Sequence, residues 1–193
     1  MNAIALTKEP ARDDFDLASK EGLLAYLKAL ERRFMEIEDH GESEQFRIYP
    51  YGGSPTTDNI MKSALKFGTP KEKEQWAAAY ENRQRAYEKA SSTAILGQNL
   101  YLYAVELAQC VRGSRHPDHA ARIINSQIEF IGNRNYSVLN NLLGEGAGEK
   151  LRKDMIDLGQ HCLRILENRD DKLFDAVRTY LKPEPATPLP LGM

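Results

Sequence analysis

Hydrophobic residues recur at alternating spacings of four and three along several segments, and this spacing places them on one face of a helix. The first such stripe follows Ser19, a favourable N-cap residue, and Glu21, a carboxylate suited to a first helical turn. We therefore expect a first helix that begins near Ser19 and ends before Gly41. Its apolar stripe consists of Leu23, Leu27, Leu30, Phe34 and Ile37.

The longest uninterrupted pattern begins at Thr69. Thr69, Pro70 and Glu72 together form a helix start, with a capping threonine, a proline at the first helical position and a glutamate that completes a capping box. The following residues up to 112 contain no further proline and a single glycine, Gly97. We expect one central helix over about 69–112, roughly 60 Å long. Because this length exceeds the usual diameter of a domain of this size, part of the helix is expected to project.

The two halves of this long helix differ in their apolar pattern. In residues 95–111 apolar side chains cover more than one face, which predicts that other helices surround this half and that it forms the centre of a bundle. Gly97 lies within it and costs about 1 kcal/mol relative to alanine. A close helix approach or a slight kink would explain this glycine, and a break into two helices is the alternative. The stripe of the first half is Trp76, Tyr80, Arg83, Tyr87, Ala90 and Ala94.

Shorter segments complete the predicted fold. Residues 41–56 mix aromatic residues with proline and glycine, which indicates an extended segment and a turn, and a short helix follows from about 57 to 67. Further helices are expected from Pro117 to Gly132, around 136–143, along the stripe from Leu151 to Ile165, and from about 170 to 182. The prediction is an all-α bundle of about six helices around the long one, with little or no β-structure. It comprises a flexible lead-in (1–14), one helical domain (15–182) and a proline-rich mobile tail (183–193).

Composition narrows the class of protein. Hydrophobic residues make up 41% and charged residues 28% of the chain, which is typical of a globular protein, and a net charge of -2 disfavours a surface that attracts nucleic acid everywhere. Charge is uneven: residues 1–60 carry 7 basic and 12 acidic residues, whereas residues 61–116 carry 9 basic and 5 acidic ones. Cys110 and Cys162 fall within apolar helical patterns and are expected to be buried. With no apolar leader or membrane-length apolar run, we expect a cytoplasmic protein without a membrane partner.

Two motifs have a superficial resemblance to catalytic or binding chemistry. His116, Asp118 and His119 offer zinc or iron ligands, but the two histidines straddle a helix start and need not converge. Residues 144–150 (GEGAGEK) are rich in glycine before a helix, yet phosphate-binding loops follow a strand, and this segment follows a predicted helix. We expect capping residues in the first case and a helix–helix connection in the second. No catalytic, cofactor-binding or metal-binding residue is assigned, and no cofactor is expected.

The most promising surface is the first half of the long helix. Trp76, Tyr80, Arg83 and Tyr87 share one side over about three turns, and these residue types are enriched in interface hot spots. The alternative is that they pack on the first or the last helix of the same chain. Tyr49 and Tyr51, in the aromatic segment 46–51, are a second candidate surface, or else part of a lid over the bundle.

These observations favour three hypotheses. The first is a non-enzymatic interaction protein that binds and modulates a larger macromolecular partner as an adaptor or inhibitor, and that forms homo-oligomers. The second is a nucleic-acid-associated regulator, because residues 71–89 interleave basic groups with tyrosines. The third is a small metal-dependent enzyme that uses His116 and His119. The basic residues behind the second hypothesis are Lys71, Lys73, Arg83, Arg85 and Lys89.

Overall fold

The computed structural model describes residues 6–167, and it is all-α over that range, with no strand. The helix predicted over 170–182 and the predicted tail 183–193 lie outside the described residues, as do residues 1–5 of the predicted lead-in. The α-helices are α1 (Lys20–Ile48), α2 (Asn59–Phe67), α3 (Pro70–Arg112), α4 (Pro117–Gly132), α5 (Asn140–Leu143) and α6 (Ala147–Glu167). Short 3₁₀ turns are η1 (Arg12–Asp14), η2 (Pro50–Gly52), η3 (Pro55–Thr57) and η4 (Ser137–Leu139). The predicted fold class, a helical bundle around one long helix, is confirmed.

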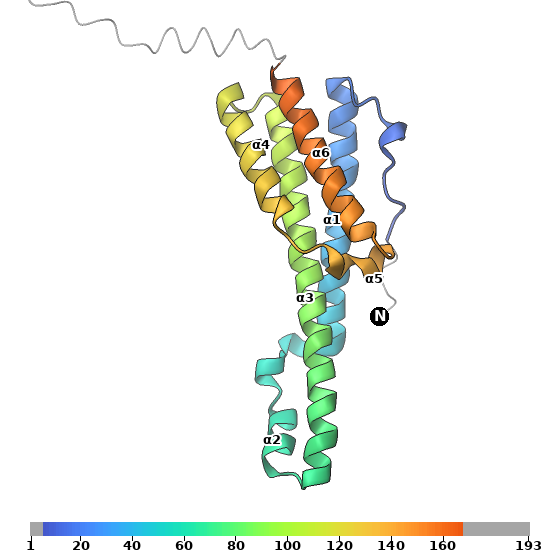
Figure 1. Ribbon diagram of the computed structural model, residues 1–193, viewed down its shortest axis with the longest axis vertical. Helices are drawn as coiled ribbons and strands as arrows, with labels where there is room; N and C mark the ends of the chain where they lie inside the picture. The colour runs from blue at the N-terminus through green and yellow to red at the C-terminus, as the bar shows by residue number, and fades with distance from the viewer. Residues whose placement is uncertain (1–5, 168–193) are drawn as a thin grey trace, which may run out of the picture.

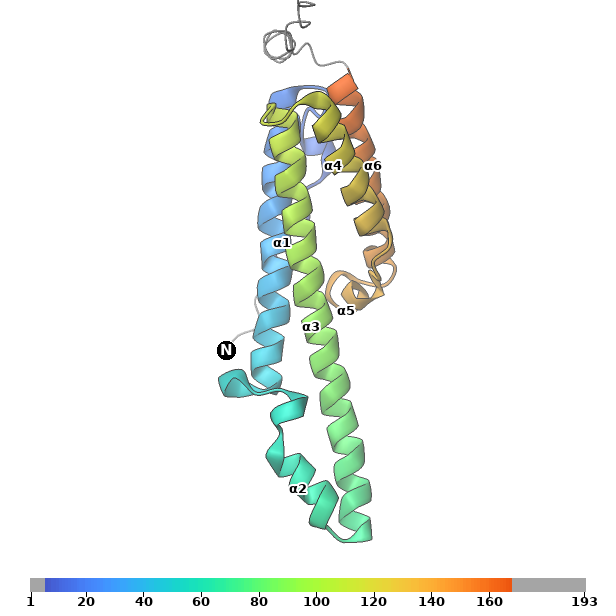
Figure 2. The same cartoon turned by 90° about the vertical axis from the view of Figure 1, so that its left-hand side faces the viewer.

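The molecule is elongated, and α3 runs through most of its length (Figure 1). α1 lies antiparallel to α3 and makes the most extensive contact with it. α4 and α6 pack against one end of this pair, while α2 packs against the other end of α3 (Figure 2). We call residues 49–89 the stalk and the remainder of residues 6–167 the body. One continuous helix, α3, therefore belongs to both parts.

The start and the end of α3 follow local chemistry. The Thr69 hydroxyl accepts a hydrogen bond from the Glu72 backbone N–H at 3.4 Å, and the Glu72 carboxylate accepts one from the Thr69 N–H at 2.8 Å. Pro70 is the first helical residue, where no backbone donor is needed. Gly113 ends the helix in the left-handed conformation, with φ of 90°. The predicted capping box is confirmed.

α3 does not break at Gly97, because α1 lies too close there for a side chain. A Cβ atom at Gly97 would be 2.5 Å from the backbone nitrogen of Glu38 in α1. Gly41 has the same role on the opposite helix, since its Cβ would be 2.4 Å from the backbone nitrogen of Ala94. The two glycines therefore let the α1 and α3 backbones approach closely, and the sequence-based expectation of close approach at Gly97 is confirmed.

The expectation that the first helix ends before Gly41 is wrong. α1 continues for seven residues beyond Gly41, to Ile48, and takes in part of the segment expected to be extended. Glycine lowers helix stability by only about 1 kcal/mol, and packing against a neighbouring helix outweighs that cost. The extended segment and turn are confined to residues 49–58, which contain η2 and η3.

The hydrophobic core lies in the body, around the second half of α3. Leu100, Tyr103, Leu107 and Cys110 of α3 are fully buried. They pack with side chains of α1, α4 and α6, as the apolar pattern of residues 95–111 predicted. The Tyr103 hydroxyl donates a hydrogen bond to the Met155 carbonyl at 2.7 Å, which satisfies a polar group that is enclosed by apolar neighbours. The bundle centre is therefore fixed by both packing and a buried hydrogen bond.

Candidate functional site

Arg83 holds the stalk together at its base. Its guanidinium donates two hydrogen bonds to the Ile48 carbonyl, at 2.7 and 3.2 Å, and one to the Asp58 carboxylate at 3.2 Å. The same group stacks over the Tyr49 ring, with 4.3 Å between the guanidinium carbon and the ring centre. Arg83 thereby joins α3 to the end of α1 and to the start of α2. Three of its hydrogen bonds are made within the chain, while the side chain as a whole stays 40% exposed.

Asp58 links the two helices of the stalk. One carboxylate oxygen accepts a hydrogen bond from the Met61 N–H at 3.1 Å and caps α2, while the other oxygen pairs with Arg83 of α3. The Asp58 side chain is only 8% exposed. A buried carboxylate needs such partners, because an unpaired charge away from water is costly. Asp58 therefore positions α2 against α3, a role that sequence analysis did not assign to it.

Two tyrosines of the predicted surface, Tyr80 and Tyr87, are partly buried against the same part of the chain. The Tyr80 hydroxyl donates a hydrogen bond to the Pro55 carbonyl at 3.0 Å. Tyr87 meets Tyr49 edge to face, with ring centres 5.5 Å apart, and Tyr49 is buried. Desolvation by burial raises the pKa of the Tyr49 hydroxyl. Tyr80, Arg83 and Tyr87 thus contact the 48–58 segment, which begins at the last residue of α1 and continues into the turns that follow it.

Trp76 and Tyr51 remain accessible to a partner. Trp76 is 42% exposed, within the first two turns of α3. Tyr51 is 96% exposed, in η2 at the junction of α1 and the stalk. Its φ of 64° is in the left-handed region, which is uncommon for an aromatic residue, and Gly52 follows with φ of 74°. The turn therefore presents the Tyr51 ring to solvent.

α2 carries two large, strongly exposed aliphatic and aromatic side chains. Ile60 is 79% exposed and Phe67 is 76% exposed. At about 100° per residue, Ile60, Ala64 and Phe67 fall within roughly 60° of one another around the helix axis. Met61 is buried, on the side that packs against α3. The apolar residues of α2 thus cover more than the face that the chain buries, and this excess is the sequence signal that could have identified Ile60 and Phe67.

The end of the stalk is positively charged. Residues 59–73 contain four lysines and one glutamate, and that glutamate, Glu72, is engaged in the capping box. The Lys66 ammonium lies 5.1 Å from the centre of the Phe67 ring, so a cation and an exposed aromatic ring are presented together. The accessible surface at this end therefore combines apolar side chains with a basic surrounding.

The histidine motif and the glycine-rich segment have structural roles. The His116 ring accepts a hydrogen bond from the Asp118 N–H at 3.4 Å and caps α4, while His119 is exposed. Within residues 6–167, no group of three or more histidine, cysteine or acidic side chains is placed to hold a metal ion. In the glycine-rich segment, the Asn140 side chain accepts a hydrogen bond from the Gly148 N–H at 3.0 Å, which uses one of the donors at the start of α6.

Arg85 is paired, and the two cysteines are enclosed. Arg85, one of the basic residues behind the nucleic-acid hypothesis, pairs with Glu81 at 3.6 Å. Cys110 and Cys162 are both fully buried, and burial raises the pKa of the Cys162 thiol to about 12. A thiol with such a pKa is a poor nucleophile at neutral pH.

Comparison with known proteins gives no matching family model, no similar curated protein and no similar solved structure. Over residues 6–167, none of the helices combines the length and the apolar character that crossing a bilayer requires.

Proposed function

We propose that this chain is a non-enzymatic interaction protein that binds and modulates a larger protein partner through the stalk. The observation that carries the proposal is the exposure of Ile60 and Phe67 on a helix whose other side is already held by α3. Large apolar side chains that stay in water on a well-packed element are typical of protein-binding surfaces. Trp76 is a third accessible anchor on the same stalk.

The internal contacts of the stalk support a preorganised docking surface. Arg83, Asp58 and Tyr80 fix the 48–58 segment and α2 against α3 before any partner arrives. Binding then orders few additional groups, which lowers its entropic cost. The proposed mechanism is steric: the stalk occupies a surface of the partner and blocks or redirects what else binds there.

The charge of the stalk defines the chemistry of its partner. Lysines dominate residues 59–73, so the complementary surface is an apolar patch with an acidic rim. The same charge disfavours the pairing of two stalk ends from two copies of the chain, because like charges repel. We therefore assign the homo-oligomer hypothesis to a different surface: Ile95 and Leu102 of α3 are exposed seven residues apart, on one face of the helix.

Site-specific photocrosslinking tests the docking proposal. A photoreactive phenylalanine analogue is placed at position 67 in the stalk or, as a matched control, at position 102, where Leu102 is exposed on the body. We expect one protein from a native lysate to be captured through position 67 and not through position 102. The captured protein is then purified, and its affinity for the wild-type chain is compared with that for an Ile60→Glu, Phe67→Glu variant.

The double variant is expected to bind at least about tenfold more weakly, because hot-spot side chains contribute about 2 kcal/mol or more each. Binding of the wild-type chain should also weaken as salt rises, because the basic end of the stalk steers association. Equal labelling from both positions, or equal affinity of the variant and the wild-type chain, would contradict the proposal. Capture of a second copy of this chain through position 102 would instead support self-association through α3.

A further inference from the structure

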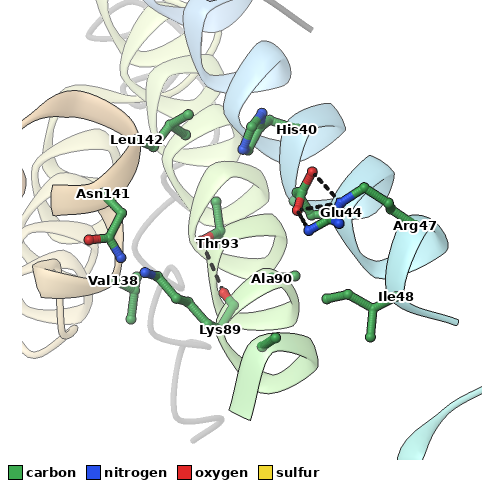
Figure 3. A pocket seen from close by; sticks show the side chains of 12 residues that line it. His40, Glu44, Arg47, Ile48, Lys89, Ala90, Thr93, Val138, Asn141 and Leu142 are labelled. Atoms are coloured by element: carbon green, nitrogen blue, oxygen red, sulfur yellow. Dashed lines mark hydrogen bonds and ion pairs between the residues drawn. The ribbon is translucent and has the colours of Figure 1, made fainter. Parts of the chain in front are cut away.

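A pocket lies at the boundary between the body and the stalk. It is bounded by the last two turns of α1, by the middle of α3 and by the η4–α5 connection, and its volume is about 230 Å³ (Figure 3). The pocket is distinct from the exposed face of α2. An inference drawn from it therefore does not depend on the proposed docking function.

Three polar side chains in the pocket wall have hydrogen-bonding capacity left over. They are His40 of α1, Lys89 of α3 and Asn141 of α5. None of these side chains makes a hydrogen bond or ion pair with another residue in the range 6–167, although His40 interacts electrostatically with Glu44. Lys89 extends toward Val138 and Asn141, so its ammonium group and the Asn141 amide lie on the same side of the pocket (Figure 3). An ammonium and an amide N–H₂ are both hydrogen-bond donors, and together they suit an anionic oxygen group.

The acidic residue of the pocket is already neutralised. The Glu44 carboxylate accepts hydrogen bonds from Arg47 Nε at 3.0 and 3.1 Å and from Arg47 Nη2 at 2.8 Å. These bonds and the charge of Arg47 lower the pKa of Glu44, so the carboxylate stays ionised and paired. Among the residues that the structure describes, Lys89 has no counter-ion, and the pocket favours an anion.

Much of the remaining wall is apolar. Ile48, Ala90, Val138 and Leu142 contribute hydrocarbon surface. A strongly hydrated inorganic anion would gain nothing from this surface. A ligand with an apolar chain would remove it from water, which contributes about 25 cal/mol for each Å² buried.

We propose that this pocket binds a small amphipathic carboxylate. The carboxylate accepts hydrogen bonds from Lys89 and Asn141, and the hydrocarbon part packs against Ile48, Ala90 and Leu142. His40, on α1, supplies a further polar group at the wall. The site is thus formed by three segments that are distant in the sequence, and it requires the bundle to be folded.

Calorimetry and NMR on the full chain test this inference with three probes: hexanoate, 1-hexanol and inorganic phosphate. We expect hexanoate to bind with a Kd on the order of 1 mM, as its small size allows. It should shift the Gly41 backbone amide and the Asn141 side-chain amide signals. 1-Hexanol, which lacks the charge, and phosphate, which lacks the chain, should each bind at least about tenfold more weakly.

Variants identify the residues that carry binding. Lys89→Met should weaken hexanoate binding about tenfold, and Asn141→Ala should weaken it in the same direction. Lys71→Met is the matched control, because Lys71 is an exposed lysine of the same helix outside the pocket, and its affinity should equal that of the wild-type chain. The inference is overturned if hexanoate leaves the Gly41 and Asn141 signals unchanged, or if Lys89→Met binds as tightly as Lys71→Met. Phosphate binding as tight as that of hexanoate would overturn the assignment to carboxylates.

Discussion

Replacing Gly97 by alanine is expected to destabilise the protein, although alanine is the better helix former. In an isolated helix the substitution would be favourable by about 1 kcal/mol. In this fold the new methyl group would lie 2.5 Å from the Glu38 nitrogen, 2.8 Å from the Glu38 Cα and 3.0 Å from the Ile37 carbonyl carbon. Normal carbon–carbon contacts need about 3.5–4.0 Å. All three obstacles are backbone atoms of α1, so no side-chain rotation can relieve the overlap.

The helices must therefore move apart by several tenths of an ångström or more, along the most extensive contact of the fold. Overpacking of this kind costs about 1–3 kcal/mol, and rigid backbone obstacles place Gly97 at the upper end of that range. After the gain of about 1 kcal/mol in helix propensity is subtracted, we expect a net loss of about 1–2 kcal/mol. For a chain of this length the melting temperature should fall by roughly 2–8 °C.

Gly132→Ala is the matched control, because Gly132 is also helical and its Cβ would meet only the Ile156 side chain, at 3.7 Å, an ordinary contact. Thermal and urea unfolding followed by circular dichroism compare the two variants with the wild-type chain. Gly132→Ala should be neutral or up to about 1 kcal/mol more stable. If Gly97→Ala proves as stable as Gly132→Ala, the close approach of α1 and α3 is not what requires glycine, and the reasoning fails.

Two further predictions concern the stalk base and the core. Arg83→Met leaves the Asp58 carboxylate and the Ile48 carbonyl without the hydrogen bonds that Arg83 donates. Amide hydrogen exchange over residues 48–67 should therefore accelerate about tenfold or more, while exchange in α6 stays unchanged. Unchanged exchange over residues 48–67 would refute this role of Arg83. Because burial raises the pKa of Cys162 to about 12, its thiolate fraction at pH 8 is about a thousandfold below that of an ordinary cysteine. Iodoacetamide should label Cys162 far more slowly in the native chain than in urea, and equal rates would contradict its burial.

Local signals explain why much of the fold could be predicted from the sequence. The capping box at Thr69 and Glu72 involves residues three apart, so the sequence displays all of its parts together. The central position of residues 95–111 could be predicted because their apolar side chains occur on more than one face of the helix. Burial of Cys110 and Cys162 follows in the same way from apolar neighbours at helical spacing.

The failures concern contacts between residues that are distant in the chain. Glycine is typical of helix ends, so Gly41 suggested that the first helix stops there. The structure shows instead that Gly41 lies inside α1, where the Ala94 backbone of α3 leaves no room for a side chain. Arginine is typical of interface hot spots, but the partners of Arg83, Ile48 and Asp58, lie 35 and 25 residues away in the sequence. No repeating pattern in the sequence predicts contacts at these separations. Sequence reasoning therefore named the first half of α3 as the candidate surface, but it could not show that Tyr80, Arg83 and Tyr87 also contact the 48–58 segment.

The continuity of α3 has a mechanical consequence. About 13 residues of the helix, 70–82, extend past the contact of Arg83 with the last residue of α1, a length of roughly 20 Å, and no break interrupts them. Because a rigid helix converts rotation into displacement, a tilt of about 10° at Arg83 would move the far end through roughly 3 Å. A small change of angle at the contact between Arg83 and the end of α1 would therefore produce a larger displacement at the end of the stalk.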